Sequence, residues 1–67
     1  MLPDWMPLEA WGEFVAMRKR KKKPLSDYAT KLAIGKLEKL RIAGENIEDV
    51  INESIFHEWD GLFAVKN

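Results

Sequence analysis

Cysteine is absent from the 67 residues of this chain, and histidine occurs once, as His57. A disulfide framework and a thiolate metal site are therefore excluded, and no second histidine completes an imidazole site. No apolar run approaches the roughly 20 residues that a membrane span requires, and the sequence has no signal peptide. We expect a cytoplasmic protein that holds no metal or cofactor and does not contact a membrane.

The lack of cross-links makes the hydrophobic core the main source of stability in so short a chain, which has room for one domain, residues 1–67. A fully buried large apolar side chain contributes roughly 2–3 kcal/mol. We therefore expect the aromatic side chains to supply much of the buried area: Trp5, Trp11, Phe14, Tyr28, Phe56, Trp59 and Phe63.

The formal net charge is zero, but acids and bases are segregated along the chain. Residues 1–17 contain three acids and no base, residues 18–23 are six consecutive bases, and residues 45–67 contain six acids and one base. The local field around residues 18–23 is thus a better guide to binding partners than the net charge.

Apolar residues recur at helical spacing in three segments, which predicts an all-α fold: a compact three-helix bundle with short extended N-terminal and C-terminal segments. Pro7 suits the first position of the first helix, and Ser26 suits the N-cap of the second. Asn46, followed by Asp49, resembles the capping box of the third. The helices are expected at about residues 7–21, 26–43 and 46–59.

Two glycines and an apolar tail complete the expected fold. Gly44 is expected just past the end of the second helix, where a left-handed residue often ends a helix. Gly35 lies inside that helix, where glycine costs up to about 1 kcal/mol relative to alanine, and a close helix crossing would explain it. The apolar residues 62–65 follow an Asp-Gly turn and are expected to pack back across the bundle.

The sequence favours a binding protein over an enzyme. Ser54 precedes His57 by three residues, but no residue is evident that would orient the imidazole, so the support for a catalytic pair is weak. The chain also has no glycine-rich phosphate loop. We expect His57 on the surface at the end of the third helix, where a cationic imidazole suits the helix dipole.

The basic run of residues 18–23 is the strongest local signal. It suits the negative C-terminal pole of the first helix, but six adjacent cations exceed what a helix end needs and repel one another. Three kinds of anion would neutralise them. The first, which we favour, is a nucleic acid; the second is an acidic protein surface, either the third helix of this chain or a partner protein; the third is lipid headgroups.

If the ligand is nucleic acid, lysine and arginine contact phosphates, and exposed aromatic rings stack on unpaired bases. Trp5, Tyr28 and Phe56 are the stacking candidates, because they lie off or at the edge of the apolar stripes. The candidate DNA-binding residues are Arg18, Lys19, Arg20, Lys21, Lys22, Lys23, Tyr28 and Lys31.

Several short motifs resemble the C-terminal domain of phage and prophage replication proteins. They are the leading LPDW, the W..F...R spacing that ends at Arg18, the basic stretch into KPLS, the L..L...G turn, the I..SI...W spacing and the closing W-x-G-L-F. The resemblance covers residues 2–65. In that family a winged-helix-like or other replication-associated domain usually precedes this one. The sequence here carries no such domain, so we expect a separated domain or a stand-alone product.

The resemblance implies a helical module of phage DNA replication in a bacterial host, similar in role to primosomal loaders that bind single-stranded DNA and recruit the replicative helicase. By position it implies roles for Arg18, Lys19, Lys22, Lys23 and Trp59. Together with the basic run, it predicts a DNA-binding module that prefers single strands.

Two alternatives follow from the acidic third segment. One is a protein-interaction module that docks a replicative helicase, a helicase loader or a host factor through the acidic helix face and the apolar tail. Its candidate residues are Glu48, Asp49, Glu53, Leu62 and Phe63. The other, which we favour less, is a small inhibitor of a host nucleic-acid enzyme.

Overall fold

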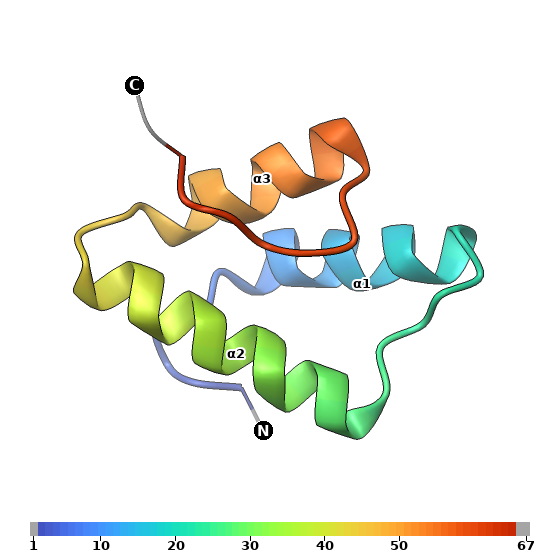
Figure 1. Ribbon diagram of the computed structural model, residues 1–67, viewed down its shortest axis with the longest axis horizontal. Coiled ribbons are helices and arrows are strands. Elements are labelled where there is room, and N and C mark those ends of the chain that lie inside the picture. Colours follow the sequence, from blue (N-terminus) through green and yellow to red (C-terminus); the bar gives the residue numbers. More distant parts are fainter. Residues whose placement is uncertain (1, 66–67) are drawn as a thin grey trace.

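The computed structural model describes residues 2–65, in which three helices span Leu8–Arg20 (α1), Asp27–Ile42 (α2) and Ile47–His57 (α3) (Figure 1). No strand occurs among these residues. The predicted all-α three-helix fold is therefore confirmed, and the predicted helices extend one or two residues too far at their ends. None of the described helices is both long and apolar enough to cross a membrane.

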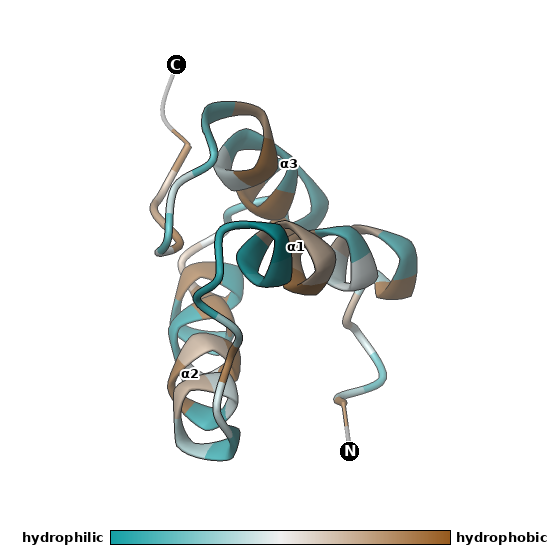
Figure 2. Ribbon diagram, turned by 90° about the vertical axis from the view of Figure 1, so that its right-hand side faces the viewer, coloured by the Kyte–Doolittle hydropathy of each residue, from teal (hydrophilic) through white to brown (hydrophobic). Residues whose placement is uncertain are grey.

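The third helix is the element that packs against both of the others. In Figure 1, α1 and α3 run in the same direction, one above the other, and α2 runs back in the opposite direction below them. The C-terminal segment then returns from the end of α3 and runs back between α2 and α3 in Figure 1, and Figure 2 shows it along one side of α3. This return path starts at Asp60, beside the end of α1, and brings Val65 to the connection between α2 and α3, where its N–H bonds to the Glu45 carboxylate at 3.2 Å.

The N-terminal ends of α2 and α3 have the predicted side-chain caps. The Ser26 hydroxyl accepts a hydrogen bond from the Ala29 N–H at 3.1 Å, and the Asn46 side-chain oxygen accepts one from the Asp49 N–H at 3.0 Å. Each cap satisfies one of the backbone donors that a helix start leaves free. Pro7 precedes α1 as its N-cap, one position earlier than predicted, with an extended backbone.

All three helices end in the same way, with a left-handed residue just past the last turn. These residues are Lys22 (φ 62°), Gly44 (φ 97°) and Glu58 (φ 56°). In each case the next N–H bonds to a carbonyl five residues earlier, as in a Schellman motif: Lys23 to Arg18 at 2.9 Å, Glu45 to Leu40 at 3.0 Å and Trp59 to Ser54 at 2.9 Å. The prediction for Gly44 is confirmed, whereas the two non-glycine positions were not foreseen.

Most core members are not aromatic, and of the seven aromatic residues expected to supply much of the buried area only Trp11 and Phe14 are buried, while Trp5 packs against the core. The buried members of the core are Met6, Ala10, Trp11, Phe14, Met17, Leu37, Ile47, Val50, Ile51 and Leu62. Tyr28 and Phe56 are 71% and 80% exposed, because they lie on the outer sides of their helices. Trp59 is 39% exposed, since the left-handed Glu58 ends α3 and turns the indole out of the apolar stripe.

The apolar tail packs back on the helices, as predicted. Leu62 is 4% exposed and belongs to the core. Ser54, which is fully buried on α3, donates a hydrogen bond to the Gly61 carbonyl at 2.9 Å. One apolar contact and one buried hydrogen bond therefore fix the chain just after α3.

Two other expectations differ from the structure. A Cβ atom at Gly35 would meet no atom within 4 Å, so no close helix crossing inside the fold explains this glycine. The leading segment is not simply extended, because the Met6 N–H bonds to the Pro3 carbonyl at 3.1 Å and closes a turn. That turn directs the Met6 side chain into the core.

Candidate nucleic-acid interface

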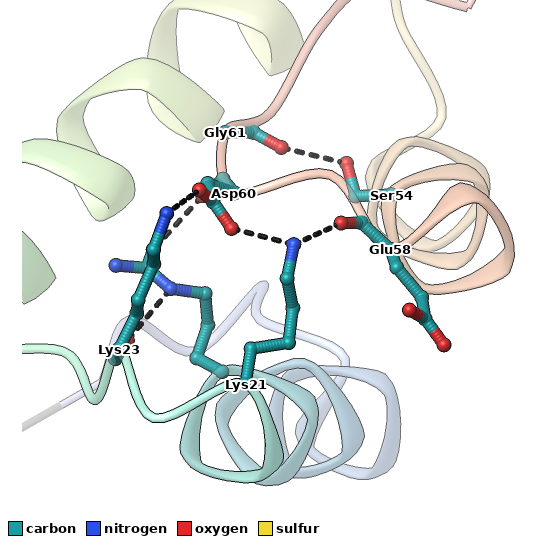
Figure 3. Close-up of polar contacts among 7 residues, drawn as sticks. Lys21, Lys23, Ser54, Glu58, Asp60 and Gly61 are labelled. Carbon is teal, nitrogen blue, oxygen red and sulfur yellow. Dashed lines mark hydrogen bonds and ion pairs between the residues drawn. The ribbon is translucent and has the colours of Figure 1, made fainter.

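The basic run is divided into two sets of side chains. Arg18, Lys21 and Lys23, which we call the inward cations, bind the turn that follows α3 (Figure 3). Lys19, Arg20 and Lys22, which we call the outward cations, are exposed and form no ion pair with an acidic group of residues 2–65. Six bases that look alike in the sequence thus have two different surroundings.

The inward cations bind one carboxylate, that of Asp60, and three backbone carbonyls. Lys21 Nζ lies 2.7 Å from Asp60 Oδ1 and also donates to the Glu58 carbonyl, and Lys23 Nζ lies 3.2 Å from Asp60 Oδ2. Arg18 donates from Nη1 to the Asp60 carbonyl and from Nε to the Lys23 carbonyl, both at 2.8 Å. These bonds join the end of α1 to the chain beyond α3.

The neighbouring cations change the acidity of the Asp60 carboxyl. The hydrogen bonds from Lys21 and then Lys23, with the charges of both, lower the pKa of the Asp60 carboxyl to about 2. The carboxylate is therefore ionised at any physiological pH and neutralises part of the run. The acidic third helix is one of the neutralising groups that the sequence allows, but the acid that pairs with Lys21 and Lys23 lies in the turn after that helix.

A second basic surface lies on the outer side of α2. Lys31, Lys36 and Lys39 are exposed around Leu32 and Gly35 and line one shallow depression. No acidic group in the described part of the chain pairs with these lysines. Tyr28, one turn before Leu32 on the same helix, is also exposed.

The end of α1 and the surface of α2 border a common groove of about 280 Å³. Arg18 from α1 and Lys36 from α2 both line it, and most of the other lining side chains are apolar. In Figure 2 the hydrophilic end of α1 continues directly into the connection to α2. The groove therefore joins the inward cation Arg18 to the α2 lysine Lys36, and the outward cations do not line it.

Acidic side chains gather elsewhere. Glu9 and Glu13 from α1 and Glu48 from α3 line another groove, between those two helices. The segregation of charge along the sequence is thus preserved in space: cations at the end of α1 and on α2, and acids on the first half of α1 and on α3. A field of this kind favours the approach of an anion to one side only.

The three predicted stacking residues have different surroundings. Tyr28 is exposed next to the basic surface of α2, whereas Trp5 is half-buried with the Arg41 guanidinium 5.2 Å from its ring centre. Phe56 is exposed on α3, where its ring touches His57 edge-on at 5.0 Å. Tyr28 is thus the candidate that lies among the lysines.

The residues proposed for protein docking are also separated. Glu48 and Asp49 are exposed in the first turn of α3, and Glu53 lies 3.2 Å from His57. Phe63 is half-exposed, but Leu62 is buried in the core and so cannot be a docking residue in this structure. Leu62 is the one prediction in this set that must be corrected.

Sequence reasoning missed a row of exposed rings at the end of α3. Phe56, His57, Trp59 and Phe63 touch one after another, and we call them the aromatic row. His57 is exposed at the last position of α3, as predicted. No group of three or more His, Asp or Glu side chains among residues 2–65 is placed to hold a metal ion.

Comparison with known proteins gives the class of this chain. Residues 7–67 match the model of the YdaU C-terminal domain, so the chain belongs to that family. It is 41% identical over 66 residues to "Uncharacterized protein YdaU" of Escherichia coli (strain K12). The alignment covers 97% of this chain but 23% of the relative, so the chain spans about a quarter of that protein's length. No solved structure matches the chain.

The match confirms that the chain corresponds to a C-terminal family domain, which is the coarser part of the resemblance noted in the sequence. The part of that resemblance that concerns phage DNA replication stays a prediction.

Proposed function

We propose that this domain is the DNA-binding module of a phage-type replication protein and that it contacts single-stranded DNA. The observation that supports this most is a set of six exposed cations that have no acidic partner within residues 2–65. They are Lys19, Arg20, Lys22, Lys31, Lys36 and Lys39.

The chemistry of these side chains suits a phosphate backbone. Lysine and arginine at the end of α1 neutralise successive phosphates and release condensed counterions, which makes binding depend strongly on salt. Tyr28 offers an exposed ring beside Lys31 on which an unpaired base would stack. The first turns of α2 carry no Asn, Gln or Arg cluster that would read base edges in a duplex groove. Backbone contact and stacking therefore favour a single strand.

The division of the basic run decides how the proposal is tested. Replacing all six bases of residues 18–23 would remove the outward cations together with the inward cations that hold Asp60. A loss of DNA binding would then have two explanations: a lost phosphate contact or a disturbed fold. The outward pair Lys19→Gln/Lys22→Gln removes only exposed charges. The inward pair Lys21→Gln/Lys23→Gln removes the same net charge and serves as the matched control.

The measurement is fluorescence anisotropy with a labelled single-stranded oligonucleotide and its duplex at low salt, with circular dichroism of each variant. We expect the outward pair to weaken binding of the single strand while the melting temperature stays the same. The inward pair should lower the melting temperature and weaken binding less. If the folded wild type does not bind at low salt, or if the outward pair binds normally, the proposal is wrong.

A further inference from the structure

We propose that the cleft between Glu53 and Trp59 binds an arginine side chain of a partner protein. This site lies apart from the outward cations, involves the opposite charge and does not depend on the DNA-binding proposal. The argument rests on the aromatic row, on the shape and polarity of the cleft, and on the charges around it.

The ring of Trp59 is held in position by its neighbours. His57 stacks on it at 4.6 Å between ring centres, with an angle of 18° between the planes, and Phe63 meets it edge-on at 5.5 Å. Even so, the Trp59 residue is 39% exposed. An aromatic ring that is both fixed and accessible loses little conformational freedom when a ligand binds to it, which favours binding.

The cleft beside this ring has a volume of about 180 Å³ and is lined by Glu53, Trp59, Ala64 and Val65. Its polar group is a single carboxylate, and its other walls are an indole and two aliphatic side chains. Glu53 Oε1 lies 3.2 Å from His57 Nε2, and Glu53 forms no other ion pair within residues 2–65.

Arginine fits this combination better than other side chains. Its planar guanidinium stacks on indole and donates hydrogen bonds to a carboxylate in the same plane, and its methylene stem is compatible with apolar walls. The row already attracts one cation within the protein, since Lys36 Nζ lies 5.6 Å from the centre of the Phe63 ring. The cleft offers a second such position together with a carboxylate.

The surrounding charge favours a cationic ligand over nucleic acid. Glu53 lines the cleft, and Glu58, which is exposed, follows the last residue of α3 beside the row. Both carboxylates would repel a phosphate backbone, although exposed rings alone would accept bases. The occupant that satisfies rings and carboxylate together is a positively charged, planar side chain of a protein.

The test uses the indole N–H signals of the three tryptophans in a nuclear magnetic resonance titration of the ¹⁵N-labelled chain. The probe is N-acetyl-arginine amide, and its neutral isostere N-acetyl-citrulline amide is the ligand control. We expect a saturable shift of the Trp59 signal with a dissociation constant on the order of 1 mM for the arginine probe. The buried Trp11 signal should stay in place, and citrulline should bind several-fold more weakly.

Two variants on α3 distinguish binding in the cleft from a general attraction of the arginine probe to acidic residues. Glu53→Gln should weaken binding of the arginine probe about threefold, as expected for loss of a partly exposed ion pair, while Glu48→Gln should leave it unchanged. The backbone spectrum of each variant reports whether the fold is intact. An unmoved Trp59 signal, equal shifts with citrulline, or equal affinity in the Glu53→Gln variant would each overturn the proposal.

Discussion

Lys22 is the position at which stability and DNA binding are expected to change in opposite directions. Its φ of 62° lies in the left-handed region, which costs an L residue roughly 1–2 kcal/mol. Glycine avoids that cost but loses about 0.5–1 kcal/mol more conformational entropy on folding. Lys22→Gly should therefore stabilise the fold by about 0.5–1 kcal/mol, which raises the melting temperature of a domain of this size by about 2–8 °C.

The same substitution removes one outward cation. If Lys22 contacts one phosphate, the slope of log K against log salt for a single strand becomes less steep by about 0.7. Lys22→Gln keeps the left-handed geometry and loses the charge, so it should reproduce the change in slope without the gain in stability. Glu58→Gly, at the matching position after α3 with φ 56°, should raise the melting temperature without weakening DNA binding.

Thermal unfolding followed by circular dichroism and anisotropy titrations at several salt concentrations measure both quantities. A Lys22→Gly protein that melts at or below the wild-type temperature would refute the assignment of a strained left-handed residue. An unchanged salt slope would refute the assignment of a phosphate contact, whatever happens to stability.

Three further predictions concern the fold. Gly35→Ala should stabilise it by about 1 kcal/mol, measured by denaturant unfolding, because the new Cβ meets no atom within 4 Å; a loss of stability would contradict this. Leu62→Ala should destabilise it by about 2–5 kcal/mol, and a loss well under about 1 kcal/mol would mean that the tail does not complete the core. Asp60→Asn removes a carboxyl whose pKa in the folded protein, about 2, lies below its ordinary value of 3.8. The stability that this carboxyl contributes is therefore present above about pH 4 and is lost as the pH falls toward 2. Melting temperatures of the two proteins should converge over that range, and a constant difference would contradict the ion pairs with Lys21 and Lys23.

The features that could be predicted from the sequence are those that neighbouring residues determine. Ser26 and Asn46 cap their helices through bonds to an N–H three residues later, and Gly44 adopts a positive φ because it lacks a Cβ. The left-handed Lys22 and Glu58 have no such local signal. At Lys22 the next carbonyl, that of Lys23, accepts a bond from Arg18 five residues earlier. At Glu58 the carbonyl of the residue itself accepts a bond from Lys21, so a contact between distant parts of the chain accompanies that helix end.

The sequence predicts the cluster of bases at residues 18–23, but it does not predict which of these side chains point inward and which point outward. Nothing in six consecutive bases distinguishes Lys21 from Lys22, because the distinction depends on Asp60, which lies 39 residues away from Lys21. The aromatic row was missed for a related reason. A helical stripe that continued to Trp59 would have buried the indole, and only the left-handed Glu58 turns it toward solvent.

The central claim is that the outward cations contact the phosphates of single-stranded DNA, and the salt dependence of binding tests it most directly. The equilibrium constant would be measured between 50 and 200 mM salt for the wild type and for Lys19→Gln/Arg20→Gln/Lys22→Gln. With one phosphate contact for each cation, the slope of log K against log salt should become less steep by about 2 in the triple variant. An unchanged slope in a folded triple variant would contradict the claim.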